Sequence, residues 1–136
     1  MAALDTNILV RFIVEDDAAQ LAAAKKLIRR CVATGESLFI PVTVALELEW
    51  VLRSNFELDK VVVIQTFNAL LAAVELSFES ESALESALRM YGDGSADFSD
   101  CMHLALVRNA GETPFWTFDK AAAKLNGARW VLNNPA

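Results

Sequence analysis

Four acidic side chains stand where the sequence predicts strands to end or helices to begin, and a fifth lies within a predicted helix. Asp5 follows the first short apolar run, and Asp119 follows a later one. Asp97 and Asp100 fall in the first turn of the helix predicted before that later run, and Glu47 lies in a helix after the second run. Because ligands of parallel α/β domains bind beyond the carboxyl ends of the strands, we expect these acids at one edge of a sheet.

A cluster of carboxylates favours one particular chemistry. Neighbouring carboxylates repel one another, so such a cluster is usually kept where a divalent cation neutralises it. Oxygen ligands alone favour Mg²⁺ or Mn²⁺ over zinc. One or two such ions activate water as hydroxide and stabilise the charge on a leaving oxygen, which is what phosphodiester hydrolysis requires. The acids therefore predict a metal-dependent hydrolase.

Each acid also has an ordinary structural explanation when it is considered alone. Asp5, Asp97 and Asp119 stand where helix N-caps are expected. Asp100 would be favoured by the dipole of its helix, and Glu47 by pairing with an arginine. The predicted convergence of all of them on one edge is the feature that favours metal binding over separate caps.

The helix that contains Glu47 also predicts which of its acids faces inward. Glu49 lies four residues before Arg53, a spacing typical of an exposed ion pair. Glu47 has no such partner at Val51 and shares a side of the helix with Trp50. The pattern therefore predicts that Glu47 faces inward and that Glu49 is exposed.

His103 is the only histidine, so a nuclease mechanism that needs two histidines is excluded. It lies three residues after Asp100, within a predicted helix. We expect a packing or hydrogen-bonding role for His103 ahead of a role as a ligand or in proton transfer.

These residues need a scaffold, and short apolar runs that alternate with longer helical patterns predict βαβ units. The predicted strands are residues 2–5, 37–40, 74–78, 115–118 and 129–132. The predicted helices run from 16 or 17 to 30, from 41 to 53, from 58 to about 73, from 79 to 91, from 95 or 97 to 110, and from 120 to 125. We expect a single domain over residues 1–136, a three-layer α/β/α fold with a central parallel sheet of about five strands.

The composition suits one globular domain with an acidic surface. The chain has 136 residues, of which 54% are hydrophobic, and this composition excludes long disorder. The net charge of −6 argues against nucleic-acid binding, unless cations bound by the acids reverse the sign of the cleft. Arg11, Lys120 and Lys124 are then candidate phosphate contacts, although each also suits an ordinary solvated surface.

Aromatic and cysteine residues are expected to be structural. Trp50, Trp116 and Trp130 offer rings for base stacking, but tryptophans in strands and on inward helix faces more often belong to the core. Cys31 and Cys101 are far apart, and they indicate neither a disulfide framework nor a zinc site. The chain has no apolar run long enough to span a membrane and no signal-like N-terminus, so we expect a cytoplasmic protein.

Four segments together resemble a known family. They are LDTNIL at residues 4–9, ELEWVLR at 47–53, DFSD at 97–100 leading into HLA at 103–105, and TFDK at 117–120. In this order and spacing they resemble the PIN-domain ribonucleases, in particular the VapC-type toxins of bacterial toxin–antitoxin pairs. The resemblance covers essentially the whole chain.

The resemblance implies roles for individual residues. Asp5, Glu47 and Asp100 would be the core metal-binding and catalytic acids, with Asp119 the fourth. Asp97 would be an accessory acid, although the resemblance leaves open which of Asp97 and Asp100 is the direct ligand, and we favour Asp100. The residues that would orient these carboxylates are Thr6, Asn7 and Thr117.

The resemblance also implies an activity and partners. The protein would be a Mg²⁺- or Mn²⁺-dependent endoribonuclease with an RNA substrate, a cognate antitoxin and a homodimeric state. One alternative is a PIN-like interaction module that has lost catalysis, which the retained acids disfavour. A phospho-receiver-like signalling domain is the other, but residues 74–78 offer no aspartate to phosphorylate and Asp5 has no acidic neighbour.

Overall fold

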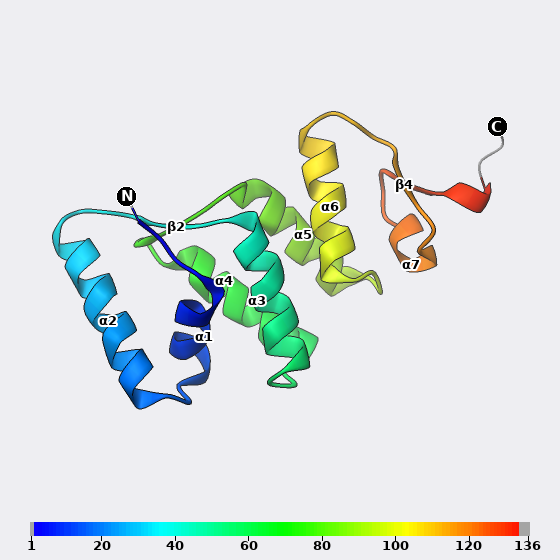
Figure 1. Cartoon of the computed structure of the whole chain (residues 1–136). Helices are drawn as coiled ribbons and strands as arrows, with labels where there is room; N and C mark the ends of the chain where they lie inside the picture. The colour runs from blue at the N-terminus through cyan, green and yellow to red at the C-terminus, as the bar shows by residue number, and fades with distance from the viewer. Residues whose placement is uncertain (1, 134–136) are drawn as a thin grey trace. The chain divides into compact units, whose positions relative to one another are not determined.

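The computed structural model describes residues 2–133 and divides the chain into two compact units, Met1–Glu79 and Ser80–Ala136. We call them unit 1 and unit 2 and describe each by itself. The chain alternates helices with short strands from one end to the other (Figure 1). Every strand described in either unit pairs in parallel.

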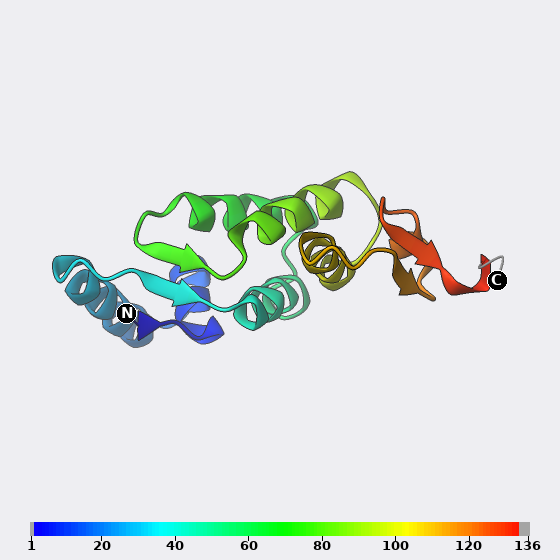
Figure 2. The ribbon, with the colours of Figure 1, turned by 90° about the horizontal axis from the view of Figure 1, so that it is seen from above.

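Unit 1 is a three-stranded parallel sheet with four helices. Its elements are β1 (Ala2–Ala3), α1 (Thr6–Val14), α2 (Ala18–Ala33), β2 (Leu38–Ile40), α3 (Val42–Ser54), α4 (Lys60–Ala72) and β3 (Leu76–Phe78). The strand order is β1-β2-β3, and Leu38 of β2 aligns with Ala2 and with Leu76. Figure 2 shows β2 and β3 running side by side in the same direction.

Apolar side chains from every helix of unit 1 and from β2 are buried. Leu38 and Ile40 of β2 are completely buried, as are Leu48 of α3 and Phe67 of α4. Leu9 of α1 is 2% exposed. Burial of such side chains contributes about 1.5–3 kcal/mol each, so these residues fix the helices against the sheet.

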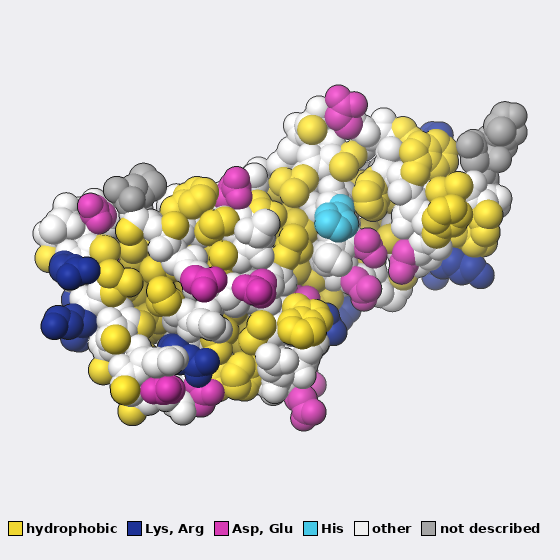
Figure 3. Space-filling model, in the orientation of Figure 1, with side chains coloured by type: hydrophobic (Ala, Val, Ile, Leu, Met, Phe, Trp, Pro, Cys, Tyr) yellow, Lys and Arg dark blue, Asp and Glu magenta, His cyan; other side chains and the backbone are white. Residues whose placement is uncertain are grey.

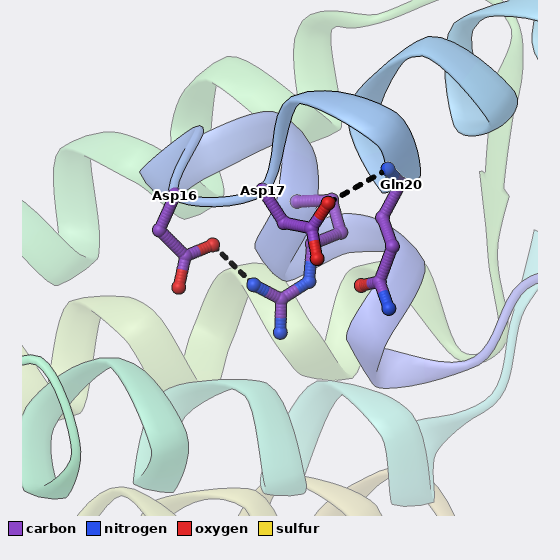
Figure 4. A network of polar contacts seen from close by, with 4 residues as sticks. Asp16, Asp17 and Gln20 are labelled. Carbon is purple, nitrogen blue, oxygen red and sulfur yellow. Dashed lines mark hydrogen bonds and ion pairs between the residues drawn. The ribbon is translucent and has the colours of Figure 1, made fainter.

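Helix α1 is an element that the sequence did not predict, and α2 is one that it did. The predicted strand over residues 2–5 ends at Ala3, and Asp5 is the N-cap of α1. Asp17 caps α2, as expected, because its carboxylate accepts a hydrogen bond from the Gln20 backbone N–H at 3.0 Å (Figure 4). The neighbouring Asp16 forms an ion pair with Arg11 of α1.

Unit 2 contains α5 (Glu81–Asp93), α6 (Phe98–Asn109), β4 (Phe115–Thr117), α7 (Lys120–Ala123), β5 (Ala128–Trp130) and η1 (Val131–Asn133). Helices α5 and α6 pack against each other, and the Tyr91 and Phe98 rings meet edge to face with centroids 5.4 Å apart. Strands β4 and β5 pair in parallel, with Trp116 aligned with Arg129. This arrangement places the start of α6 and the end of β4 in one unit.

The α/β fold class is confirmed, with mixed helices and parallel strands as a three-layer α/β/α fold requires. The five strands pair as a group of three and a group of two. Most elements lie within a few residues of their predicted bounds, but the strands are shorter. Both cysteines are free and buried, as expected. In the described part of the chain, no helix is long and apolar enough to cross a membrane.

Candidate metal centre

Three aspartates of unit 2 come together. Asp97, Asp100 and Asp119 each offer a carboxylate oxygen, and these oxygens lie within 4.8 Å of one another. Asp97 and Asp119 are exposed, whereas Asp100 is partly buried. Figure 3 shows acidic side chains gathered beside the single histidine, which is His103 of α6. We call Asp97, Asp100 and Asp119 the acid triad.

The local backbone explains how each member of the acid triad is placed. Asp97 occupies the N-cap position of α6 without making a side-chain cap hydrogen bond, and Asp100 lies in the first turn. Asp119 caps α7 by accepting a hydrogen bond from the Ala122 backbone N–H at 2.8 Å. Its own backbone N–H donates to the Thr117 hydroxyl at 3.0 Å, so Thr117 holds the loop that carries Asp119.

The electrostatics of the acid triad favour a bound cation. Burial raises the pKa of Asp100 above its ordinary value, and the nearby charges of Asp119 and Asp97 raise it further. His103 acts in the opposite sense and lowers the pKa of Asp100. A group whose ionised form is disfavoured by burial and by like charges is relieved when a cation binds beside it.

Two further predicted acids are linked within unit 1. Asp5 accepts a hydrogen bond from the Thr6 backbone N–H at 2.7 Å. The Thr6 hydroxyl donates to Oε1 of Glu47, and Thr6 itself is buried. This hydrogen bond links Glu47 of α3 to the first residue of α1.

The predicted orientation of Glu47 and Glu49 is wrong. Glu47 is exposed, whereas Glu49 is buried with a relative exposure of 4%. The predicted ion pair of Glu49 with Arg53 is present, with Nε 2.7 Å from Oε2, but it is buried at the glutamate end. The spacing identified the pair correctly, and the error lay in the assumption that an ion pair four residues apart faces water.

Asn7 and Arg11 line a cleft of 340 Å³ in unit 1. Among the hydrogen bonds described for residues 2–133, none joins either residue to a predicted metal-binding acid. The cleft lies along α1 and α2, and its remaining lining residues are Ile8, Gln20, Ala23, Ala24 and Leu27. The ion pair with Asp16 engages part of the Arg11 guanidinium group.

Two of the three tryptophans are exposed, which contradicts their expected place in the core. Trp50 is 55% and Trp116 is 43% exposed, and Trp130 is partly buried. A tryptophan on a helix or strand need not be buried if that face meets no other element. Lys120 lies over Trp130, with Nζ 5.1 Å from the ring centroid, and Lys124 is exposed just after α7.

His103 and Arg129 complete the surroundings of unit 2. The His103 ring is exposed, and its centroid lies 6.2 Å from that of the Phe115 ring. No sequence pattern singles out Arg129. Its guanidinium carbon lies 5.9 Å from the Trp116 ring centroid. The signal for this contact is the alternation of side chains along two paired strands, which requires knowing the register.

The donor set fits a hard divalent ion. Carboxylate oxygens are the only ligand atoms of the acid triad, and such ligands suit Mg²⁺ or Mn²⁺ better than zinc. Because two of the three aspartates are exposed, a bound ion would also be open to water.

The sequence is similar to known proteins. The sequence is 21% identical over 125 residues to a protein named VapC ribonuclease from Aquifex aeolicus (strain VF5), and the alignment covers 92% of each chain. The sequence also matches the PIN domain family over residues 2–128, a range that includes all the acids described above. The chain therefore belongs to the PIN domain family.

Proposed function

We propose that this protein is an endoribonuclease that depends on Mg²⁺ or Mn²⁺. The observation that carries the proposal is the acid triad, in which three carboxylate oxygens lie within 4.8 Å of one another and burial and like charges raise the pKa of Asp100. Membership of the PIN domain family and similarity to a protein named VapC ribonuclease support the same activity.

Asp100 and Asp119 of the acid triad would be metal ligands, with Asp97 as the accessory acid, and Asp5 and Glu47 of unit 1 are proposed as further metal-binding acids. A bound ion would supply an activated water and stabilise the charge on the leaving oxygen. Thr6 would orient Glu47 through its hydroxyl group, since that hydrogen bond is present. Thr117 would hold the backbone at Asp119. Asn7, which follows Thr6 in the sequence, would help to orient the carboxylates.

Lysine and arginine side chains would help to hold the RNA phosphates. Lys120 and Lys124 are exposed at the two ends of α7, directly after Asp119. Arg11 is a further candidate, with its guanidinium group already paired with Asp16. In an acidic protein these few basic groups would act together with the bound cation.

Mutation of single acids tests the proposal. Asp5→Asn, Glu47→Gln, Asp100→Asn and Asp119→Asn should each lower RNA cleavage by orders of magnitude in Mg²⁺, because each removes a ligand charge at nearly constant size. Asp97→Asn should cost less. The measurement is the rate of cleavage of a labelled single-stranded RNA by purified protein free of any partner.

A matched control separates loss of a ligand from a general loss of negative charge. Asp59 occupies the N-cap position of α4 without a side-chain cap hydrogen bond, as Asp97 does for α6. Asp59→Asn should therefore cleave at the parent rate. An Asp100→Asn protein as active as the parent would contradict the assignment.

We further propose that the protein is the toxin of a toxin–antitoxin pair in the cytoplasm, a homodimer neutralised by a small antitoxin. The similarity to a protein named VapC ribonuclease supports this biological role. The antitoxin is expected to be encoded by a small adjacent gene and to suppress RNA cleavage when it is added to the purified protein. A monomer in sedimentation experiments at high micromolar concentration would contradict the dimer.

A further inference from the structure

The segment from β4 to β5 carries aromatic and basic side chains that the proposed metal ligands do not use. Trp116 and Phe118 are 43% and 71% exposed, although both are large and apolar. Residues 115–130 hold three basic residues and one acid, in a chain whose net charge is −6. Exposed rings beside basic groups mark this part of an acidic protein as a candidate binding surface.

Two of the three basic groups lie against indole rings. Trp116 of β4 faces Arg129 of β5 across the parallel pair, and the Arg129 guanidinium carbon lies 5.9 Å from the ring centroid. Lys120 Nζ lies 5.1 Å from the Trp130 ring centroid. These are cation–π distances, so each contact restricts a long side chain that would otherwise sample many rotamers.

The aromatic segment leads directly into the acid triad. Phe118 precedes Asp119, and the Trp130 indole N–H donates to the Phe118 carbonyl oxygen at 3.2 Å. Trp130 thereby fixes the backbone beside the carboxylate that caps α7. Figure 3 shows hydrophobic side chains adjacent to the acidic ones in unit 2. We call Trp116, Phe118, Lys120, Arg129 and Trp130 the stacking platform; Lys124, the third basic residue of the segment, is outside it.

We propose that the stacking platform binds single-stranded RNA beside the acid triad. Bases would stack on the exposed rings of Trp116 and Phe118, while Arg129 and Lys120 would contact phosphates. Proteins hold single strands in this way because every unpaired base has a face to stack and a phosphate to neutralise. Bases inside a duplex offer no free face, so the platform selects single strands. This inference rests on the proposed nuclease function and names its substrate.

Binding can be measured without cleavage. In an Asp100→Asn background with Mg²⁺, the anisotropy of a labelled single-stranded oligouridine reports its affinity. Trp116→Ala and Phe118→Ala should each weaken binding by about five- to a hundredfold, the usual range for loss of one stacked base. Trp116→Phe should keep most of the affinity, since the ring remains. An RNA duplex of the same length should bind more weakly and respond little to these changes.

The salt dependence of RNA affinity tests the phosphate contacts of Arg129 and Lys120 separately. Arg129→Gln and Lys120→Gln should each make the slope of log affinity against log salt shallower by about 0.7, the value for one phosphate contact on a single strand. Arg29, an exposed arginine of α2, is the matched control, and Arg29→Gln should leave the slope unchanged.

Two results would overturn the stacking platform. One is unchanged oligouridine affinity in both alanine variants. The other is a change in sedimentation from dimer to monomer with RNA affinity unchanged, which would make these rings a contact between copies of the chain. Because Trp116→Phe and Arg129→Gln are mild substitutions, they keep the test valid if an alanine variant does not fold. If the platform variants lose RNA binding but the parent never cleaves RNA, the platform stands and the nuclease proposal fails.

Discussion

The carboxylate of Asp119 has two roles that can be separated. It caps α7 through the Ala122 backbone N–H, and it belongs to the acid triad. Asparagine caps helices about as well as aspartate, but it lacks the charge that a divalent ion needs. Asp119→Asn should therefore unfold at nearly the parent temperature in EDTA and lose much of the Mg²⁺-dependent rise in Tm.

Asp119→Ala provides the comparison, because it removes the cap as well. It should lose about 1 kcal/mol of stability in EDTA in addition to the metal response. If Asp119→Asn keeps the full Mg²⁺-dependent rise in Tm, Asp119 is a helix cap and no more.

Asp100 predicts a dependence of stability on pH. Its pKa in the folded protein lies above the ordinary value, mainly because of burial. Between the two values the folded state binds more protons than the unfolded state, so stability falls as pH rises through this window and stays lower above it. Without divalent ions, Asp100→Asn should therefore be as stable as the parent or more stable at neutral pH, and any gain should vanish below the ordinary carboxyl pKa.

Metal binding should make the parent more stable than Asp100→Asn. An ion that binds only the folded state stabilises it by about 2.7 kcal/mol at a hundredfold excess over Kd. The parent should gain stability with Mg²⁺ or Mn²⁺ and Asp100→Asn should gain little, as measured by thermal melts with and without EDTA. A variant that is destabilised in EDTA and shows an unaltered metal shift would identify Asp100 as structural.

For single residues, the sequence predicted the place of each acid along its helix better than the burial of its side chain. Asp97, Asp100 and Asp119 each lie at or near a helix start, and helix starts can be predicted from capping residues. The exposure of Glu47 and the burial of Glu49 depend on which elements pack against α3, and spacing along one helix does not contain that information. The hydrogen bond from Thr6 to Glu47 joins residues 41 positions apart and needs the fold as well.

At the scale of elements, the turn into β5 depends on a glycine. Gly127 has φ +103°, a conformation that residues with a Cβ atom rarely adopt, and a Cβ there would lie 3.4 Å from Leu104 Cδ1. Gly127→Ala should therefore destabilise the protein by about 1–2 kcal/mol in urea unfolding. Because the turn sets β5 beside β4, RNA affinity at the stacking platform should also fall.

Gly94 is the matched control for this prediction. Its φ is −132°, and the nearest atom that a new Cβ would meet is the Met90 carbonyl oxygen at 3.6 Å. Gly94→Ala should change stability by only a few tenths of a kcal/mol. Equal effects of the two substitutions would contradict the importance of the left-handed turn.

The prediction of helices succeeded where apolar spacing or a capping residue marked them. Helix α2 has apolar residues at core spacing and α6 begins after the capping position Asp97, and the structure contains both helices near their predicted bounds. Strand β1 has only two residues, so it has no alternation of its own, and α1 begins only three residues after it ends. Short strands are defined by their hydrogen-bonded neighbours, which the sequence does not specify.

At the scale of the whole molecule, the single-domain prediction can be tested by cooperativity. The PIN family match covers residues 2–128 and so includes parts of both units. We expect one unfolding transition. Trp50 belongs to unit 1, whereas Trp116 and Trp130 belong to unit 2. Fluorescence of Trp50→Phe then reports on unit 2, and fluorescence of the Trp116→Phe/Trp130→Phe double variant reports on unit 1.

The urea midpoints of these two proteins should each coincide with the midpoint followed by circular dichroism. Each variant also needs its own circular dichroism curve, since a phenylalanine substitution shifts stability by itself. If fluorescence and circular dichroism disagree within one variant, the two units unfold separately and the chain does not behave as a single domain.

In the proposed function, carboxylates of this chain bind a divalent ion that the protein uses to cut RNA internally. The most direct measurement uses a circular single-stranded RNA, which has no ends, incubated with the purified protein in Mg²⁺, in EDTA, and in EDTA followed by excess Mn²⁺. We predict that the parent linearises the circle in Mg²⁺, does nothing in EDTA and recovers with Mn²⁺, while Asp100→Asn leaves the circle intact throughout. Linearisation by the parent in EDTA, or by Asp100→Asn at the parent rate, would contradict the claim.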